Sequence, residues 1–206
     1  MTEQVFDFDI RQQPDIGRMC GVKDVVNRRV LDPPLIIELK PSNYTEGPFS
    51  NRMLPLDSYV LNVSLTSEDC KESRNDFRAG RHIRHNIIGD TVGNARILLD
   101  PEDRKHKPFF VLPNISIRLT GTYTICCTVI NVVSGQVSTK FTRPLNVYSC
   151  GQFPGYLATS KLTRSFIYQG LSVREKGVKA KLPLLLENEK HIQNYPTTDS
   201  NQTLPA

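Results

Sequence analysis

The chain has 206 residues, of which 38% are hydrophobic and 23% are charged, and its formal net charge is +5. This composition excludes a wholly disordered protein, and the length predicts one domain, with or without tails. No apolar run approaches the roughly 20 residues that a membrane-spanning helix needs. The first residues also lack the basic and then apolar pattern of a secretory signal. We therefore expect a soluble, intracellular protein that contacts no membrane, with its five cysteines as thiols.

In chain order, short strands are the dominant prediction. They are indicated by a two-residue alternation of apolar and polar side chains or by short apolar runs between Pro, Gly and Asn. The predicted strands are 35–40, 58–66, 96–100, 108–112, 115–120, 122–132, 137–142, 145–149 and 171–174. The alternation places eight residues in the core: Leu61, Val63, Leu65, Ile117, Tyr123, Ile125, Cys127 and Val129. Between strands 115–120 and 122–132, Gly121 indicates a turn or bulge.

Two segments are not strand-like. Residues 67–86 are polar and carry charges of both signs, which predicts a long loop. Residues 160–169 predict a short helix that begins at Thr159 or Ser160, buries Leu162 and Phe166, and ends at Gly170. Helices of 10–15 residues between the strands, which a βαβ fold requires, are missing. The sequence therefore predicts an all-β, immunoglobulin-like antiparallel β-sandwich with one or two short helices.

Catalytic chemistry finds little support. The nucleophile elbow, the phosphate-binding loop, the dinucleotide fingerprint and the zinc-protease motif are all missing. Cys70, His82, His85 and His106 are the best metal candidates, but zinc prefers two closely spaced ligand pairs and only His82 and His85 are close. We favour a solvated basic loop there, with no metal and no cofactor.

Acidic and thiol groups give no stronger case for an enzyme. Asp100, Glu102 and Asp103 flank a proline turn beside basic residues, and a solvated turn is favoured over an acid–base pair. Cys126 and Cys127 are adjacent on a strand and so point to opposite faces, with Cys127 a core residue. Cys20 lies near arginines that lower thiol pKa values, but no histidine nearby completes a nucleophile.

Basic residues cluster in two segments. Residues 11–29 hold Arg11, Arg18, Lys23, Arg28 and Arg29, and residues 161–181 hold six cations that include Lys161 and Arg164. Two basic segments on one sandwich can grip phosphates, but basic loops also simply keep a protein soluble. On charge alone the second interpretation is favoured.

A family resemblance changes this balance. The segments RQQPDIGRMCG and LDPPLIIEL, followed in order by YVLNVSL, NIIGDTVGNARILLD, KPFFVLPNISIRLTGTYTICCTVINV and FPGYLATSKLTRSFIYQGLSVREK, resemble the velvet regulators of fungi. The resemblance covers roughly residues 5–180. It implies a β-sandwich similar to the Rel-homology domain, in a nuclear regulator of sporulation and secondary metabolism that shuttles with the cytoplasm or stays nuclear.

The resemblance also implies partners and contact residues. The expected partners are double-stranded DNA and a second velvet protein, identical or related, in a dimer. DNA contact is implied for Arg11, Arg18, Lys23, Arg28 and Arg29, with Lys161 and Arg164 as second-tier candidates. We predict a domain over residues 1–180 and a polar tail over 181–206 that is disordered. The alternative is an interaction sandwich that dimerises with a DNA-binding relative and contacts DNA little itself.

Overall fold

The computed structural model describes residues 6–21, 29–41 and 55–173. Its strands are β1 (Phe6–Gln12), β2 (Ile16–Arg18), β3 (Leu35–Pro41), β4 (Tyr59–Ser67), β5 (Asp76–Ala79), β6 (His82–His85), β7 (Ile87–Gly89), β8 (Val92–Asn94), β9 (Arg96–Leu99), β10 (His106–Leu112), β11 (Ile115–Ile117), β12 (Gly121–Asn131), β13 (Val137–Phe141) and β14 (Leu145–Tyr148). A single turn of 3-10 helix spans Leu56–Ser58, and one α-helix, α1, spans Lys161–Tyr168. Within these ranges, no helix has the length and apolar character needed to cross a bilayer.

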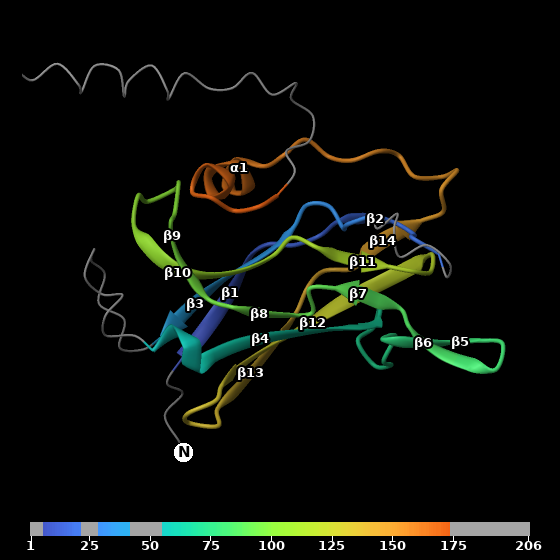
Figure 1. The fold of residues 1–206 in the computed structure, drawn as a ribbon, viewed down its shortest axis with the longest axis horizontal. Helices are drawn as coiled ribbons and strands as arrows, with labels where there is room; N and C mark the ends of the chain where they lie inside the picture. Colours follow the sequence, from blue (N-terminus) through green and yellow to red (C-terminus); the bar gives the residue numbers. More distant parts are fainter. Residues whose placement is uncertain (1–5, 22–28, 42–54, 174–206) are drawn as a thin grey trace, which may run out of the picture.

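Two sheets form a sandwich. One has the strand order β1-β3-β10-β9, and the other has the order β2-β14-β12-β4-β8, with β13 also paired to β12 (Figure 1). The pair β14–β2 is parallel, and the other named pairs in these sheets are antiparallel. The short pairs β11–β7 and β5–β6 lie outside the two main sheets. The predicted all-β sandwich is therefore confirmed.

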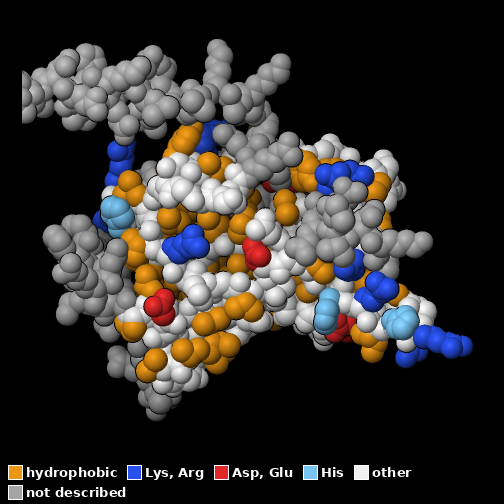
Figure 2. Space-filling view, viewed as in Figure 1, with side chains coloured by type: hydrophobic (Ala, Val, Ile, Leu, Met, Phe, Trp, Pro, Cys, Tyr) orange, Lys and Arg blue, Asp and Glu red, His pale blue; other side chains and the backbone are white. Residues whose placement is uncertain are grey.

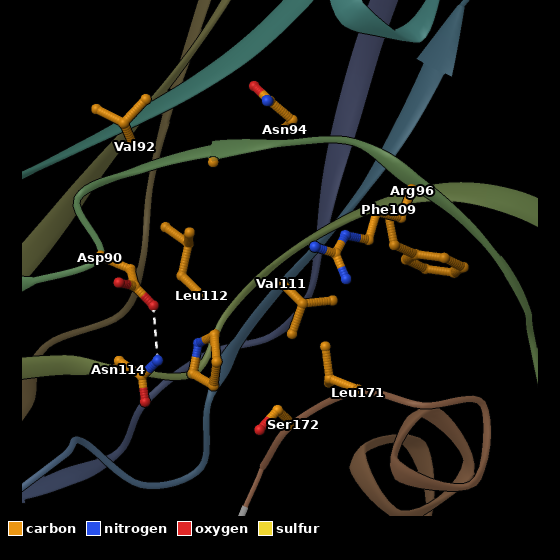
Figure 3. A pocket seen from close by; sticks show the side chains of 12 residues that line it. Asp90, Val92, Asn94, Arg96, Phe109, Val111, Leu112, Asn114, Leu171 and Ser172 are labelled. Atoms are coloured by element: carbon orange, nitrogen blue, oxygen red, sulfur yellow. Dashed lines mark hydrogen bonds between the residues drawn. The ribbon is translucent and has the colours of Figure 1, made fainter.

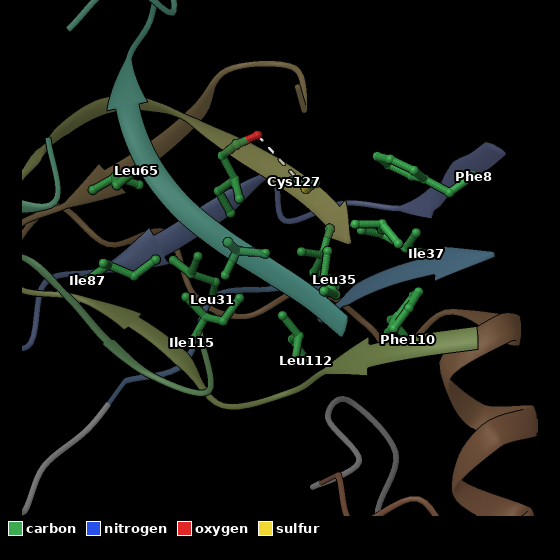
Figure 4. Close-up of a cluster of buried hydrophobic side chains, with 14 of the residues drawn as sticks. Phe8, Leu31, Leu35, Ile37, Leu65, Ile87, Phe110, Leu112, Ile115 and Cys127 are labelled. Atoms are coloured by element: carbon green, nitrogen blue, oxygen red, sulfur yellow. Dashed lines mark hydrogen bonds between the residues drawn. The ribbon is translucent and has the colours of Figure 1, made fainter. Parts of the chain in front are cut away.

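The core lies between the sheets. On β4 and β12 the predicted alternation is confirmed, because Val63 pairs with Cys127 and Leu65 pairs with Ile125, and all four are buried. All eight predicted core residues are buried. They pack with side chains such as Phe8, Ile37 and Phe110 from the other sheet (Figure 4). Burial raises the pKa of the Cys127 thiol to about 12, with a smaller contribution from neighbouring Cys126, so Cys127 is an inert core residue.

Helix α1 covers the outer face of the four-stranded sheet. Ser160 begins the helix by accepting a hydrogen bond from the Thr163 N–H, and Gly170, with φ of +90°, follows its end. Phe166 is fully buried against Phe109, with ring centroids 4.9 Å apart. The predicted helix is confirmed. Phe166, Phe109, Leu98 and Ile36 form a second, smaller core beneath the helix. Because Ile36 lies in this cluster, β3 is buried on both faces.

The structure differs from the predicted strands and loops in several places. The 67–86 segment is not one loop, because it folds into the β5–β6 hairpin. Residues 171–173 form no strand, and residue 174 lies outside the described residues. Strand β1 was missed, although Phe6 and Phe8 alternate with Asp7 and Asp9. Its apolar face becomes evident only from its pairing with β3.

Candidate nucleic-acid interface

Arg18 lies on the outer face of β2, because the preceding residue, Gly17, faces the core. Gly17 is buried, and a Cβ there would lie 2.5 Å from Cδ2 of Leu31, so this position faces the core. Successive residues of a strand point to opposite faces, so Arg18 faces away from the core. Its side chain is half-buried, and its Nε has no hydrogen-bond partner among the described residues.

The chain on either side of residues 22–28 is attached to the same strip of backbone. Before this segment, the N–H groups of Cys20 and Gly21 donate to the carbonyls of Ile117 and Arg118, at 3.0 and 3.2 Å. After it, Val30 forms an antiparallel bridge with Ser116. These attachments place Arg29 beside β11, at the same end of the sandwich as Gly21. The predicted contacts Lys23 and Arg28 lie outside the described residues.

Arg118 lies in the middle of this arrangement, and the site prediction did not include it. Its Nη1 donates to the Gly21 carbonyl at 2.9 Å, and its backbone N–H donates to the Asn86 carbonyl at 2.9 Å. The alternation through residues 115–120 does predict an outward Arg118. The same alternation is wrong for Ser116, which is fully buried because the Val30 segment covers it.

The β5–β6 hairpin adds cations at this end. It carries Arg78, Arg81, Arg84, His82 and His85, and one carboxylate, Asp76. That carboxylate pairs with Nδ1 of His85 at 2.6 Å. The base of the hairpin is joined to the Arg118 region through Asn86, whose side-chain oxygen accepts from the Leu119 N–H at 3.1 Å. Figure 2 shows basic and histidine side chains gathered over this end of the molecule. We call Arg18, Arg29, Arg118 and the hairpin cations the basic end.

Arg11 occupies a different environment. Its guanidinium bonds to Glu38, to Asp100 at 2.7 Å and to Glu102 at 2.6 Å. Lys107 also reaches Asp100, at 3.0 Å. The guanidinium of Arg11 is thus engaged by three carboxylates of its own chain, on the side of the sandwich formed by β3, β9 and β10.

The prediction of a solvated turn at residues 100–103 is wrong for Asp100. Its side chain is 0% exposed. Burial on its own raises the pKa of this carboxyl, but hydrogen bonds from Arg11, the Glu102 N–H and Lys107 outweigh burial and hold the pKa below its ordinary value. Asp100 is an ionised, fully bonded core carboxylate, and the sequence spacing alone did not reveal its two cationic partners.

Lys161 and Arg164 belong to α1, which packs on the β9–β10 side. The side chain of Gln169, just after the helix, bonds to both backbone groups of Leu99, at 2.6 and 2.9 Å. In Figure 1, α1 and the β5–β6 hairpin lie toward opposite ends of the long axis. The structure therefore brings Arg18 and Arg29 to the strip that holds Arg118, and it leaves Lys161 and Arg164 away from the hairpin.

A pocket of about 450 Å³ lies between β8, β10 and the chain after α1 (Figure 3). Val92, Val111, Leu112 and Leu171 give it an apolar wall. Its charged lining residues are Asp90, which bonds to Asn114 at 2.8 Å, and Arg96. His, Cys and Lys do not occur among its described lining residues. Across the described ranges, no cluster of three or more His, Cys, Asp or Glu has metal-binding geometry, and His82 and His85 lie on opposite faces of the β5–β6 hairpin.

A family model described as velvet factor matches residues 6–81 and 72–179, which together cover most of the chain. The chain belongs to the velvet family. The spore development regulator umv1 of Mycosarcoma maydis is 24% identical over 82% of this velvet chain and 26% of its own length. The spore development regulator vosA of Beauveria bassiana is 27% identical over 84% of this chain and 67% of its own length. For the sexual development regulator velC of Gibberella moniliformis, the identity is 26% over 85% of this chain and 40% of the relative.

In this velvet chain, the residues that sequence reasoning missed are Arg118 and the three hairpin arginines. A signal for the hairpin was present in the printed sequence, because Gly80 separates two short segments in which arginine recurs. The mixed charges of residues 67–75 concealed it. Those charges pair locally, as in Arg74 with Glu72 at 2.6 Å and Lys71 with Asp69 at 3.4 Å.

Proposed function

We propose that this velvet protein is a nuclear, DNA-binding regulator of development that acts as a homo- or heterodimer. Its relatives carry the names of spore and sexual development regulators, which supports the developmental role. The observation that carries DNA binding is the basic end. Arg29 and Gly21 flank residues 22–28, which hold Lys23 and Arg28, and both flanks are attached to the strip beside Arg118.

Electrostatic docking is the mechanism that this arrangement favours. Arginines and lysines neutralise phosphates and release condensed counterions, and this drives association without reading sequence. Arg18 and Arg28 or Arg29 then contact base edges, because an arginine fork matches O6 and N7 of guanine in the major groove. Arg11 positions the start of the domain through its carboxylate partners and does not contact DNA itself.

Salt dependence tests the docking mechanism. Duplexes are first selected by the purified protein from a random pool, and binding is then measured by gel shift between 50 and 200 mM salt. With about six phosphate contacts, affinity falls roughly a thousandfold over this range. A response that stays flat with salt, or a pool that yields no enriched duplex, contradicts the proposal.

A second function, protein interaction, is favoured by the outer face of the six-stranded sheet. Val137, Ile130 and Val60 form one row across β13, β12 and β4, and Phe141, Cys126 and Ser64 form another. Val137 is 58% exposed and Phe141 is 46% exposed, and neither row carries a charge. An exposed apolar patch marks an interaction surface. Relatives named velvet complex subunits support a second velvet domain as the partner.

Sedimentation with and without the selected duplex separates the two functions. A DNA regulator binds the duplex on its own, whereas an interaction sandwich binds it only when a DNA-binding relative is added. Val137→Lys places a charge on the apolar row and is expected to shift the protein toward monomer. If Val137→Lys sediments as the wild type does, this face is not the dimer interface.

A further inference from the structure

The β5–β6 hairpin is a two-stranded ribbon that stands apart from the two main sheets. Asp76 pairs with His85 and Arg78 pairs with Ile83, so these two pairs share one face of the ribbon. Phe77 pairs with Arg84 and Ala79 pairs with His82, on the other face. All four residues of β6 are exposed, and Ile83 is 74% exposed. The ribbon therefore presents cations on both faces and an apolar side chain next to its tip.

Arg78, Arg81 and Arg84 form no ion pair with any residue of the described ranges. This contrasts with Lys71 and Arg74 just before the hairpin, which both pair with nearby carboxylates. An isolated two-stranded ribbon is marginally stable in water, and like charges around its tip repel each other. Repulsion among these arginines thus destabilises the hairpin in the free protein. Binding of a polyanion would neutralise their charge and remove this repulsion.

The position of the ribbon favours DNA as the polyanion, because the ribbon leaves the sandwich within the basic end. At its base, the Asn86 N–H donates to the Asn75 carbonyl at 2.5 Å, and the Asn75 side-chain oxygen accepts from the Leu65 N–H at 2.6 Å. Asn86 also accepts from the Arg118 N–H, so the ribbon leaves the sandwich beside Arg118. Within the basic end, a continuous series of hydrogen bonds therefore joins the hairpin to Arg118.

We propose that the β5–β6 hairpin is a second DNA-contacting arm, which binds phosphates and enters a groove adjacent to the one met by Arg18 and Arg29. This inference rests on the proposed DNA-binding function. The major groove of B-form DNA, about 12 Å wide, admits a two-stranded ribbon. Arg78, Arg81 and Arg84 bind phosphates at the groove edges, and Ile83 contacts a thymine methyl group.

The test uses the full chain, a duplex selected by the wild-type protein, and the triple variant Arg78→Gln, Arg81→Gln, Arg84→Gln. Its matched control is Arg96→Gln, Arg104→Gln, Lys105→Gln, which removes the same charge from the β9–β10 side. Each lost phosphate contact lowers the slope of log affinity against log salt by about 0.9. The hairpin variant is expected to lower the slope by about 2.7 and to shorten the hydroxyl-radical footprint, whereas the control changes neither.

Each outcome decides one of the two proposals. If the wild type binds no duplex, the proposed DNA-binding function is contradicted, and so is the proposed role of the hairpin. If the wild type binds and the hairpin variant matches the control in slope and footprint, only the arm is overturned. The single variant Arg81→Gln changes one residue of the turn between the strands and keeps the test valid if the triple variant does not fold. Its expected loss of slope is about 0.9.

Discussion

The guanidinium of Arg11 lies 2.7 Å from the carboxylate of Asp100, 89 positions further along the chain. This contact joins β1 to the turn after β9, and it converts a residue of the basic N-terminal segment into a structural cation. Lys107 also forms an ion pair with Asp100. The charges of Arg11 and Lys107 thus neutralise those of two buried carboxylates, Asp100 and Glu38.

Arg11→Met is expected to destabilise the protein by about 3–5 kcal/mol, because removing one partner leaves buried charge uncompensated. Urea unfolding followed by circular dichroism measures this free energy. Arg104→Met, on the exposed turn of the same region, serves as the control and should change stability by about 0.5 kcal/mol or less. Equal losses in the two variants would mean that the Arg11 ion pairs contribute little.

Asp100 makes stability depend on pH. Its pKa is lower in the folded chain than in the unfolded chain, so its contribution is complete above the ordinary value near 3.9 and is lost as pH falls through the lower folded value. Asp100→Asn should therefore be less stable than the wild type at pH 7. The difference should narrow below about pH 4, measured as unfolding free energy across pH. A difference that stays constant down to pH 2 contradicts this assignment.

Gly89 tolerates no side chain. Its φ is +103°, and a Cβ there would lie 1.7 Å from the Asn114 carbonyl oxygen, which is backbone and has little freedom to move. Gly89→Ala should cost about 3 kcal/mol or more in a thermal or urea melt. Gly135→Ala is the matched control, since Gly135 has φ of +71° with open space around it. It should show only the left-handed backbone cost of about 1–2 kcal/mol.

A binding assay should distinguish the predicted contacts in residues 11–29 from those on α1 by how much each lowers duplex affinity when replaced. Arg28→Ala with Arg29→Ala removes the charge of Arg29, in the basic end, and of its neighbour in the sequence. This variant should bind the selected duplex more weakly while its thermal midpoint changes little, because surface charge adds little stability. Lys161→Ala with Arg164→Ala removes the same charge from α1 and should weaken binding less. Equal losses in both double variants would place α1 on the DNA. A large fall in the midpoint of the first variant would make Arg29 structural.

Much of the fold was predictable because it depends on local pattern. Alternation along β4, β11 and β12 identified all eight core residues, and Ser160, Phe166 and Gly170 marked the helix. The hairpin in residues 67–86 was missed because each of its strands is only four residues long and buries no side chain, so the alternation of Asp76 and Arg78 with Phe77 and Ala79 is too short to predict a strand. Ser116 was assigned to the wrong environment because its cover comes from Val30, 86 positions earlier in the sequence.

The sequence by itself determined the class of fold and the family, because both reside in residue order: the period of two and the succession of velvet motifs. Only the tertiary structure decided which cations are available to a ligand. Arg11 and Arg29 belong to the same basic segment, yet Arg11 is held by three carboxylates, whereas Arg29 directly precedes the residue that bridges to Ser116 of β11. Charge pairing acts through space between residues far apart in the chain, so the fold, and not the spacing, assigns each arginine its role.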